Sequence, residues 1–561
     1  MSEAPVHIYA DVLVIGAGGA GMYAALAAAE AGADRIVLAD RNMVGRGGAT
    51  VMAQMTVAAA LGEAEPDSVD DHLEDTLEAG RELCDPALAA LLCEEGPARI
   101  REMDSWKVGW AREDGHIAQV TAPGHKRRRC CYVDILNTGP AVAATLRRRI
   151  ARVDAIRRVS GLVVTDPVLA DGRLAGAVGF DIETGRAVTV AARATVLATG
   201  GLTGLYARSS ASANMAGEGH AFALAAGAAL IDMEFVQFFP IGHLFPRLVG
   251  MDPIMWDPFR YKLGGRLLNG EMEEFLPRYG GTDAGRYTAT RDLATHAIWH
   301  EARAGRGSPH GGAWLSFTHV SEAALRDAFG PVIDRLHANG IDLTEAPVEV
   351  APIAHYHMGG IAVDAGLATR VPGLFAAGEA VGGANGANRL SGNAITEALV
   401  FGHGAGRNAA AEALRTAGAW APSAAQPALD TLAERREARG EGLSTLALSR
   451  ELGRLMWEQV GPLRDAAGLA GAVARIRGMR DELPDLSVPA CGAYDTGLAD
   501  WYGLRAGLEV AEAIAATAAR RQESRGAHQR EDFAEIDPGF ARSQIVTRAG
   551  GDLAPAFGAA A

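Results

Sequence analysis

A glycine-rich turn between an apolar segment and an alanine-rich segment is the feature that most constrains the fold. Residues 10–16 form a short apolar run with β-branched side chains, which is typical of a strand buried on both faces. Residues 16–21 read GAGGAG, and the segment 22–30 favours a helix. Residues 35–40 form a second apolar run that ends on an acid. This order and spacing predict a βαβ unit.

Each glycine of the turn has a physical reason to be there. Gly16 permits the tight turn, Gly18 lets the backbone approach a pyrophosphate, and Gly21 lets helix and strand pack closely. The N-terminus of the following helix then directs its N–H groups at the phosphates. Asp40 ends the second strand, where an acid accepts hydrogen bonds from ribose hydroxyls. The sequence therefore predicts a dinucleotide site, which NAD and FAD would both fit.

The length of 561 residues exceeds what one hydrophobic core supports, so we expect about two to four domains. With 48% hydrophobic and 22% charged residues, the chain is not a mostly disordered one. Its net charge of −15 disfavours nucleic acid as a partner and argues against adhesion to anionic lipid.

The five cysteines are scattered, and no CxxC pair occurs. We therefore expect no iron–sulfur cluster and no metal site on this chain, and we expect a reducing compartment. The N-terminal segment shows no secretory pattern, and no run of 18 or more apolar residues lacks a charge. These observations predict a cytoplasmic protein without direct membrane insertion.

The composition and residue spacing of the chain change along its length. Hairpin turns at residues 170–172 and 183–185 lead into a buried strand at 194–201 that ends on paired glycines. Residues 235–351 carry many aromatic residues and prolines without βαβ rhythm, which indicates an inserted domain. From 352 the apolar-strand pattern returns, and from about 425 the spacing is helical. We interpret residues 547–561 as a tail of small residues.

Five further segments carry a resemblance to one family. They are Ala198-Thr199-Gly200-Gly201, His355-Tyr356-His357-Met358-Gly359-Gly360, Gly378-Glu379, Gly386-Ala387-Asn388-Arg389-Leu390-Ser391-Gly392-Asn393 and Glu523-Ser524-Arg525-Gly526-Ala527-His528. In this order they resemble motifs of the succinate dehydrogenase/fumarate reductase flavoprotein subunit family, which also includes L-aspartate oxidase. The resemblance runs from residue 11 to about 533.

The resemblance implies an α/β fold with three parts. A Rossmann-like FAD-binding domain would comprise residues 1–234 and 352–424, an inserted α+β capping domain residues 235–351, and a C-terminal helical domain residues 425–561. The implied FAD-binding residues are Gly16, Gly18, Gly19, Gly21, Asp40, Gly48, Thr50, Thr199, Gly200, Glu218, Glu379 and Asn393.

The resemblance also implies a reaction in which hydride passes between flavin N5 and one carbon of a carboxylate-activated C–C bond. Arg291 takes the place of the arginine that exchanges a proton with the neighbouring carbon. Arg389 can hold a carboxylate bidentately, and His355 can donate to the same end of the substrate. From the residues alone, Arg291 could instead pair with Asp292, and His355 could be a buried structural histidine. For His357 we favour a structural role over a metal ligand.

Three features depart from the family pattern. Ala49 stands where the family's dehydrogenases carry the histidine that binds flavin covalently, so the FAD should be non-covalent. This departure favours alkene reduction, or an oxidase, over succinate oxidation. Phe239 replaces the histidine that binds a second substrate carboxylate, and residues 244–262 show no match to the family's Thr-Glu pair. Fumarate is therefore not expected in the usual pose.

Two explanations of Phe239 remain open. A replacement anion site could come from cationic side chains further along the capping domain, namely His243, Arg247, Arg260 or Lys262. Alternatively, the substrate carries an apolar or aromatic group at that end, facing Trp256, Phe259 and Phe239.

We predict an FAD-dependent oxidoreductase that acts on CH–CH groups of a small carboxylic acid, with alkene reduction preferred. Its alternatives are an oxidase similar to L-aspartate oxidase, and a flavoprotein subunit whose iron–sulfur or other electron-transfer partner is a separate polypeptide. A flavin-binding protein with a decayed active site is a third. A reductase similar to the alpha subunit of adenylylsulfate reductase is disfavoured by the motifs at 355–360 and 386–393.

The segment His125-Lys126-Arg127-Arg128-Arg129 is a basic run in an acidic protein. It is either a solvated loop, which we favour, or a docking site for an acidic partner or substrate. The adjacent Cys130 and Cys131 are interpreted as two ordinary thiols.

Overall fold

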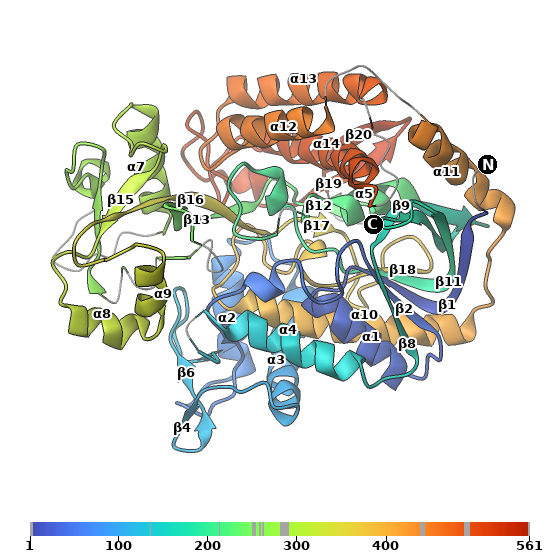
Figure 1. Cartoon of the computed structure of the whole chain (residues 1–561), viewed down its shortest axis with the longest axis horizontal. Coiled ribbons are helices and arrows are strands. Elements are labelled where there is room, and N and C mark those ends of the chain that lie inside the picture. The colour runs from blue at the N-terminus through green and yellow to red at the C-terminus, as the bar shows by residue number, and fades with distance from the viewer. Residues whose placement is uncertain are drawn as a thin grey trace.

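The computed structural model describes residues 4–134, 136–212, 214–248, 254–256, 260, 263–280, 291–437, 444–486, 488 and 494–558, with the side chains of residues 291 and 292 left outside this description. Figure 1 shows a central body with a lobe at the left and a layer of helices along the top. The predicted βαβ unit is present as β1 (Val6–Ile15), α1 (Gly19–Glu30) and β2 (Ile36–Asp40). β1 and β2 pair in parallel.

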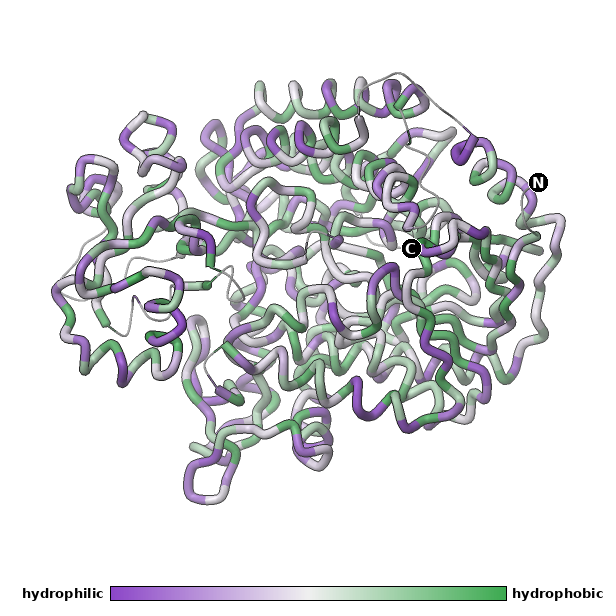
Figure 2. The backbone as a smooth tube through the Cα atoms, viewed as in Figure 1, coloured by the Kyte–Doolittle hydropathy of each residue, from purple (hydrophilic) through white to green (hydrophobic). Residues whose placement is uncertain are grey.

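The central body is built on a seven-stranded sheet. Its order is β8 (Ile156–Ser160), β2, β1, β11 (Ala187–Leu197), β10 (Arg173–Asp181) and β9 (Leu162–Ala170), with β18 (Leu374–Ala376) also paired to β11. β9, β10 and β11 are joined by the two predicted hairpins. β18 follows the predicted insertion in sequence and still pairs in parallel with β11. Figure 2 shows that these strands carry mostly hydrophobic residues.

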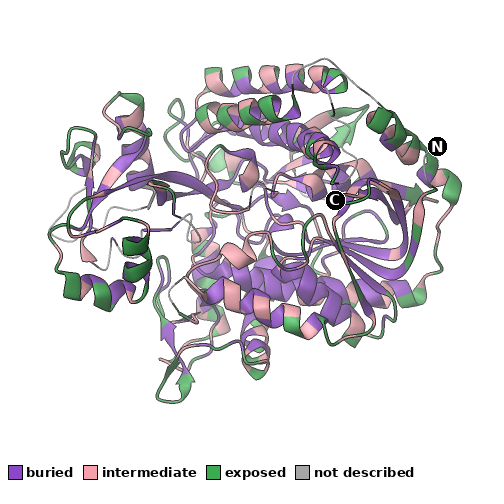
Figure 3. Ribbon diagram, viewed as in Figure 1, coloured by how far each residue is buried: buried purple, intermediate pink, exposed green. Residues whose placement is uncertain are grey.

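The helix α10 (Asn393–Arg415) packs closely along α1 on one face of this sheet. Two glycines of α10 make the close approach possible. A Cβ on Gly402 would lie 2.5 Å from the carbonyl oxygen of Ala20, and one on Gly406 would lie 2.1 Å from that of Ala24. Both helices are largely buried (Figure 3). α4 (Thr138–Ile150) contacts α1, α3 (Pro86–Ser105) contacts α10, and α2 (Val69–Ala79) contacts α3.

The lobe at the left of Figure 1 corresponds to the inserted segment. Its four-stranded antiparallel sheet has the order β13 (Val236–Phe245), β16 (Val348–His357), β15 (Ala313–Ser316) and β14 (Arg266–Leu268). The helices α7 (Arg291–Arg303), α8 (Glu322–Phe329) and α9 (Val332–Ala338) surround it. The lobe has its own apolar core. β13 and β16 pair over nearly their whole length and reach back to the central body.

The top layer consists of α11 (Pro422–Glu437), α12 (Thr445–Gln459), α13 (Ala466–Glu482) and α14 (Thr496–Arg520). α14 is the most buried of the four and contacts α5 (Glu218–Ala226). Among the described residues, no helix has both the length and the apolar character needed to cross a membrane.

The interpretation of residues 547–561 as a tail was wrong. β19 (Gln544–Ala549) and β20 (Asp552–Phe557) form a hairpin that pairs with β12 (Leu230–Ile231), which in turn pairs with β17 (Gly360–Ile361). Gly550 and Gly551 both have positive φ, as a two-residue hairpin turn requires. The small residues therefore mark a turn and its flanking strands.

Short elements complete the body. β3 (Val57–Ala58), β7 (Cys130–Cys131) and β6 (Gln119–Val120) form a small sheet, and β4 (Arg112–Glu113) pairs with β5 (His116–Ile117). The 3-10 turns are η1 (Thr50–Met52), η2 (Thr203–Leu205), η3 (Leu276–Tyr279), η4 (Gly378–Ala380), η5 (Leu483–Asp485) and η6 (Pro538–Phe540).

We expect Gly406→Ala to lower the free energy of unfolding by about 1–3 kcal/mol, because the new methyl group meets backbone that cannot yield cheaply. The matched control is Gly478→Ala in α13, where the nearest atom is the end of the Arg475 side chain. That change should raise stability by about 0.5–1 kcal/mol. Thermal unfolding of the purified variants measures both, and equal melting temperatures would contradict the proposed packing.

Candidate active site

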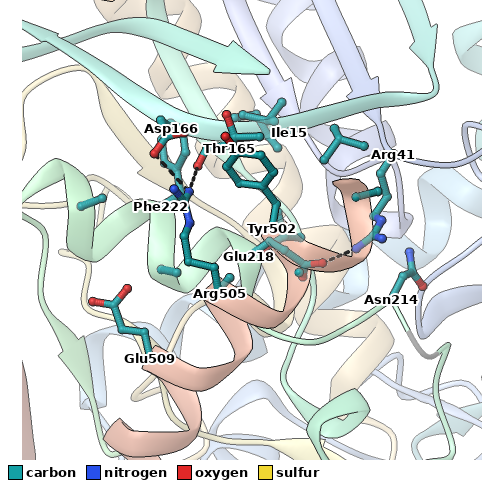
Figure 4. A pocket seen from close by; sticks show the side chains of 18 of the residues that line it. Ile15, Arg41, Thr165, Asp166, Asn214, Glu218, Phe222, Tyr502, Arg505 and Glu509 are labelled. Atoms are coloured by element: carbon teal, nitrogen blue, oxygen red, sulfur yellow. Dashed lines mark hydrogen bonds and ion pairs between the residues drawn. The ribbon is translucent and has the colours of Figure 1, made fainter. Parts of the chain in front are cut away.

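A cavity of about 410 Å³ lies where the glycine turn, the start of α10 and the ends of β11, β13 and β16 meet. A second cavity of about 490 Å³ lies between the edge of the main sheet and α14. Figure 4 shows this second cavity, with Tyr502 and Arg505 projecting from α14 toward Thr165 and Asp166. Both cavities are lined by Gly16, Asp40, Thr199 and Asn214, so they adjoin along one elongated site.

The glycine turn is held by close backbone contacts. Gly16 has a φ of +97°, and a Cβ there would lie 2.4 Å from the carbonyl oxygen of Ala198. A Cβ on Gly21 would lie 1.8 Å from the carbonyl oxygen of Gly16, so only glycine lets α1 start this close to the strand. Gly18 has open space instead, on the side of the 410 Å³ cavity. Gly21 itself lines neither cavity.

Asp40 fixes the turn from the end of β2. Its carboxylate accepts hydrogen bonds from the backbone N–H of Ala17 at 2.9 Å and of Asn42 at 2.8 Å. Burial raises the pKa of Asp40, although these two hydrogen bonds oppose the increase. One side of the carboxylate therefore supports the turn while the residue lines both cavities.

The loop before η1 forms another wall of the 410 Å³ cavity. Thr50 Oγ1 accepts a hydrogen bond from the N–H of Gly19 at 3.2 Å. A Cβ on Gly48 would meet nothing within 4 Å, and its φ is +81°. Ala49 also lines the cavity and carries no group that could bond covalently to a cofactor.

The segment after β11 packs against Glu379 in η4. A Cβ on Gly201 would lie 2.3 Å from Glu379 Oε1, so this glycine makes room for the carboxyl group. Glu379 accepts a hydrogen bond from the N–H of His357 at 3.1 Å, and burial raises its pKa to about 8. Thr199 Oγ1 is buried and has no hydrogen-bond partner within the described part of the chain. Such an orphaned hydroxyl beside two cavities is suited to a bound polar group.

Two predicted cofactor residues lie apart from the glycine turn. Glu218 begins α5, forms an ion pair with Arg41 and lines only the 490 Å³ cavity (Figure 4). Asn393 begins α10 but is fully buried and lines neither cavity. Its side chain bonds to His72 Nε2 at 2.9 Å and to Thr76 Oγ1 at 3.2 Å, so it ties α10 to α2.

His355 and Arg389 both line the 410 Å³ cavity. His355 Nδ1 lies 2.8 Å from Ser210 Oγ. The Arg389 guanidinium lies 4.5 Å from the centre of the Tyr356 ring and donates to Gln237 Oε1 at 3.0 Å. The structure therefore brings together two residues that are 34 positions apart in sequence.

A buried acid behind Arg389 was not predicted from the sequence. Glu397 accepts hydrogen bonds from the Tyr356 hydroxyl and from Asn385 Nδ2. Burial raises the pKa of Glu397 to about 7, opposed by Tyr356, Asn385 and Arg389. The sequence feature that could have indicated this acid is its position within the apolar run of residues 394–401. An acid buried in such a run needs a hydrogen-bond partner.

The wall beside His355 is apolar. Phe239, Met255 and Ile353 form a cluster, and the rings of Phe239 and His355 are 5.4 Å apart. Trp256 lies in the separate core of the lobe, packed on Phe317 and Phe329, and does not face the cavity.

The cationic candidates for a replacement anion site do not line the cavity where they are described. His243 bonds to Trp256 Nε1 at 3.1 Å and to the carbonyl of Pro246, Arg247 is exposed, and Arg260 is fully buried. Phe259 and Lys262 lie outside the described residues. Arg291 begins α7, but its side chain is not among those described.

The basic run is matched by acids. Arg129 is buried against Asp67 and Asp75, and Lys126 lies near Asp75 and Glu78. Arg128 pairs with Glu113. The run therefore cross-links its surroundings rather than forming a cationic docking patch. Cys130 is buried, which raises its pKa to about 12 and makes the thiol unreactive.

These features fit a bound dinucleotide. The backbone is accessible at Gly18 in the turn and at Gly48 in the adjoining loop, because no atom lies within 4 Å of a Cβ built there. The buried Thr199 hydroxyl could hydrogen-bond to a bound group, since it has no partner within the described part of the chain. The two adjoining cavities provide the extended shape that such a molecule needs.

Comparison with known proteins agrees with this geometry. A family model described as FAD binding domain matches residues 11–395, and one described as fumarate reductase flavoprotein C-term matches residues 449–552. A fumarate reductase (CoM/CoB) subunit from Methanothermobacter marburgensis is 35% identical over 546 residues, covering 96% of this chain and 97% of that protein. L-aspartate oxidase of Streptomyces coelicolor is 34% identical over 549 residues, covering 96% and 92%.

A solved structure of E. coli quinol fumarate reductase superposes with a TM-score of 0.90 at 30% identity, covering 98% of this chain and 97% of that one. The predicted family, fold class, FAD cofactor and oxidoreductase class are confirmed. The chain belongs to the family of fumarate reductase and succinate dehydrogenase flavoprotein subunits, and it is an FAD-dependent oxidoreductase.

Proposed function

We propose that this flavoprotein reduces a C=C bond conjugated to a carboxylate. The observation that carries the proposal is the position of Arg389, which lines the same cavity as the glycine turn and is oriented by Gln237 and Tyr356. A planar guanidinium held in this way suits bidentate binding of a carboxylate. His355 adds a second polar group to the lining of this cavity.

FAD held by the glycine turn, Asp40 and Thr199 would supply two electrons as a hydride. The π bond of the alkene breaks, one carbon gains the hydride, and its neighbour gains a proton. Arg389 binds the carboxylate and withdraws electron density from the alkene. When the Ser210 hydroxyl donates to His355 Nδ1, the ring proton resides on Nε2, which can donate to the same carboxylate. Arg291 is the proposed proton donor.

The FAD is proposed to be non-covalent, because Ala49 offers no bonding atom. A reduced iron–sulfur or other electron-transfer partner on a separate polypeptide would return the two electrons, since this chain has no CxxC pair. Relatives named as subunits support this arrangement. The scattered cysteines favour a cytoplasmic location.

The test is anaerobic. Acid precipitation of one sample first checks that the FAD is released and therefore non-covalent. The remaining holoprotein is reduced with dithionite and mixed with unsaturated acids while the flavin absorbance is followed. We expect rapid reoxidation by at least one acid. Reoxidation by air alone, together with reduction by an amino acid, would replace this proposal with the oxidase.

Arg389→Lys should lower kcat/KM for reoxidation by about 10- to 100-fold, because a lysine loses the bidentate, charge-assisted hydrogen bonds. The matched control is Arg407→Lys on the exposed side of α10, which should leave kcat/KM unchanged. Equal rates in both variants would remove Arg389 from the carboxylate site.

Arg291→Ala and Arg291→Lys should each lower kcat by at least about 100-fold, the usual contribution of a positioned proton donor. The binding of a saturated acid to the oxidised holoprotein, followed by the shift in visible absorbance, should change far less. Arg303→Ala at the other end of α7 is the control. Full turnover in both Arg291 variants would contradict the assigned role.

The KM of the acid should rise by about 3- to 10-fold between pH 6 and 8. Glu397 is neutral below its raised pKa of about 7, and above it the carboxylate competes with the substrate for Arg389. Glu397→Gln should flatten this rise, leaving a smaller one near pH 8 from Glu379. Glu412→Gln, further along α10 and paired with Arg173, is the control. Identical pH profiles for wild type and Glu397→Gln would contradict the coupling.

A further inference from the structure

We propose that the substrate is an α,β-unsaturated monocarboxylic acid whose second substituent is an alkyl or aryl group. This inference rests on the proposed function and specifies the class of acid. The carboxylate binds at Arg389 and His355, and the substituent lies against Phe239 and Met255.

The cationic side chains of the cavity limit how many carboxylates the substrate can carry. Among the described side chains that line it, Arg389 and His355 are the only ones from arginine, lysine or histidine. Glu379 lines the cavity as well. At the Phe239 end of the cavity, a second carboxylate would face the apolar side chains of Phe239 and Met255, because Arg389 and His355 already bind the first carboxylate. Burying a charge in this way is strongly unfavourable.

The apolar wall limits the substituent at the other end of the substrate to an apolar group. The exposed fractions of Phe239, Met255 and Ile353 are 6%, 5% and 6%. Phe239 and Met255 line the cavity, while Ile353 packs behind them and pairs with Phe239 across β13 and β16. The Phe239 ring adjoins His355 at 5.4 Å, so the apolar wall begins where the carboxylate site ends.

The wall is held in place from both sides. Gln54, in a loop of the central body that lines the cavity, accepts a hydrogen bond from the N–H of Met255 at 3.1 Å. Phe239 is part of a strand that pairs with β16 on either side of it. A substituent against this wall therefore meets a preformed apolar surface rather than mobile side chains.

The test compares fumarate with crotonate and cinnamate as oxidants of the dithionite-reduced holoprotein. We expect crotonate or cinnamate to exceed fumarate by at least about 100-fold in kcat/KM, since an uncompensated carboxylate is so costly to bury. A preference for fumarate of that size would overturn the inference and leave the proposed reduction standing.

Ligand binding separates the two proposals. Succinate and 3-phenylpropionate are titrated into the oxidised holoprotein, and the visible flavin absorbance is followed. If no acid reoxidises the flavin, the proposed function fails, but tighter binding of 3-phenylpropionate would still support the assigned substrate class. Tighter binding of succinate would overturn it.

Variants of two adjacent residues complete the test. Phe239→His should raise the ratio of fumarate to cinnamate kcat/KM by at least about 10-fold, because an imidazole can donate to a second carboxylate. Phe239→Leu should keep the preference for the monocarboxylate. Phe238→Leu is the matched control, since Phe238 points away to Tyr206 and Trp457. An unchanged ratio in Phe239→His would overturn the inference, whatever fraction of the variant is folded.

Discussion

A buried cluster of arginines and acids joins the three parts of this molecule. Arg521, fully buried after α14, donates to Glu234 at 2.6 Å and to Glu523 at 3.0 Å. Arg464, between α12 and α13, donates to the backbone carbonyl of Glu234 at 2.8 Å. Glu234 lies just before β13, where the chain leaves the central body. Arg521 and Arg464 of the C-terminal part therefore bind the chain at this place. Removing one partner would strand a buried charge, at a cost of about 3–5 kcal/mol.

The active site depends on this anchor through two strands. β13 starts two residues after Glu234, and β16 pairs with it along nearly its whole length. β16 then supplies His355 to the cavity, the Tyr356 ring beneath Arg389, and the N–H of His357 to Glu379. One strand thus serves the carboxylate site, the guanidinium and the buried acid near the cofactor.

How much the sequence could predict follows from how local each interaction is. The glycine turn and its acid can be predicted from the 31 residues 10–40 alone. The contacts of Gly16, Gly21 and Asp40 are made within a single βαβ unit and the strand beside it. Glu397 and Met255 could not be recognised in this way, because their roles depend on partners far away in sequence. Trp256 looked available to a substrate, yet only the folded lobe shows that it packs in a core.

Charge balance links these distant residues to the choice of substrate. Burial raises the pKa of Glu379 to about 8 and that of Glu397 to about 7, so near pH 6 both acids are mostly protonated and compete least with a carboxylate for Arg389. A single carboxylate pairs with the Arg389 guanidinium, whereas a second carboxylate at the other end of the substrate would face Phe239 and Met255. Phe239, at the position where an imidazole could have met a second carboxylate, makes the wall apolar instead. The described part of the cavity is therefore matched to one negative charge, and selectivity follows from that match as much as from shape.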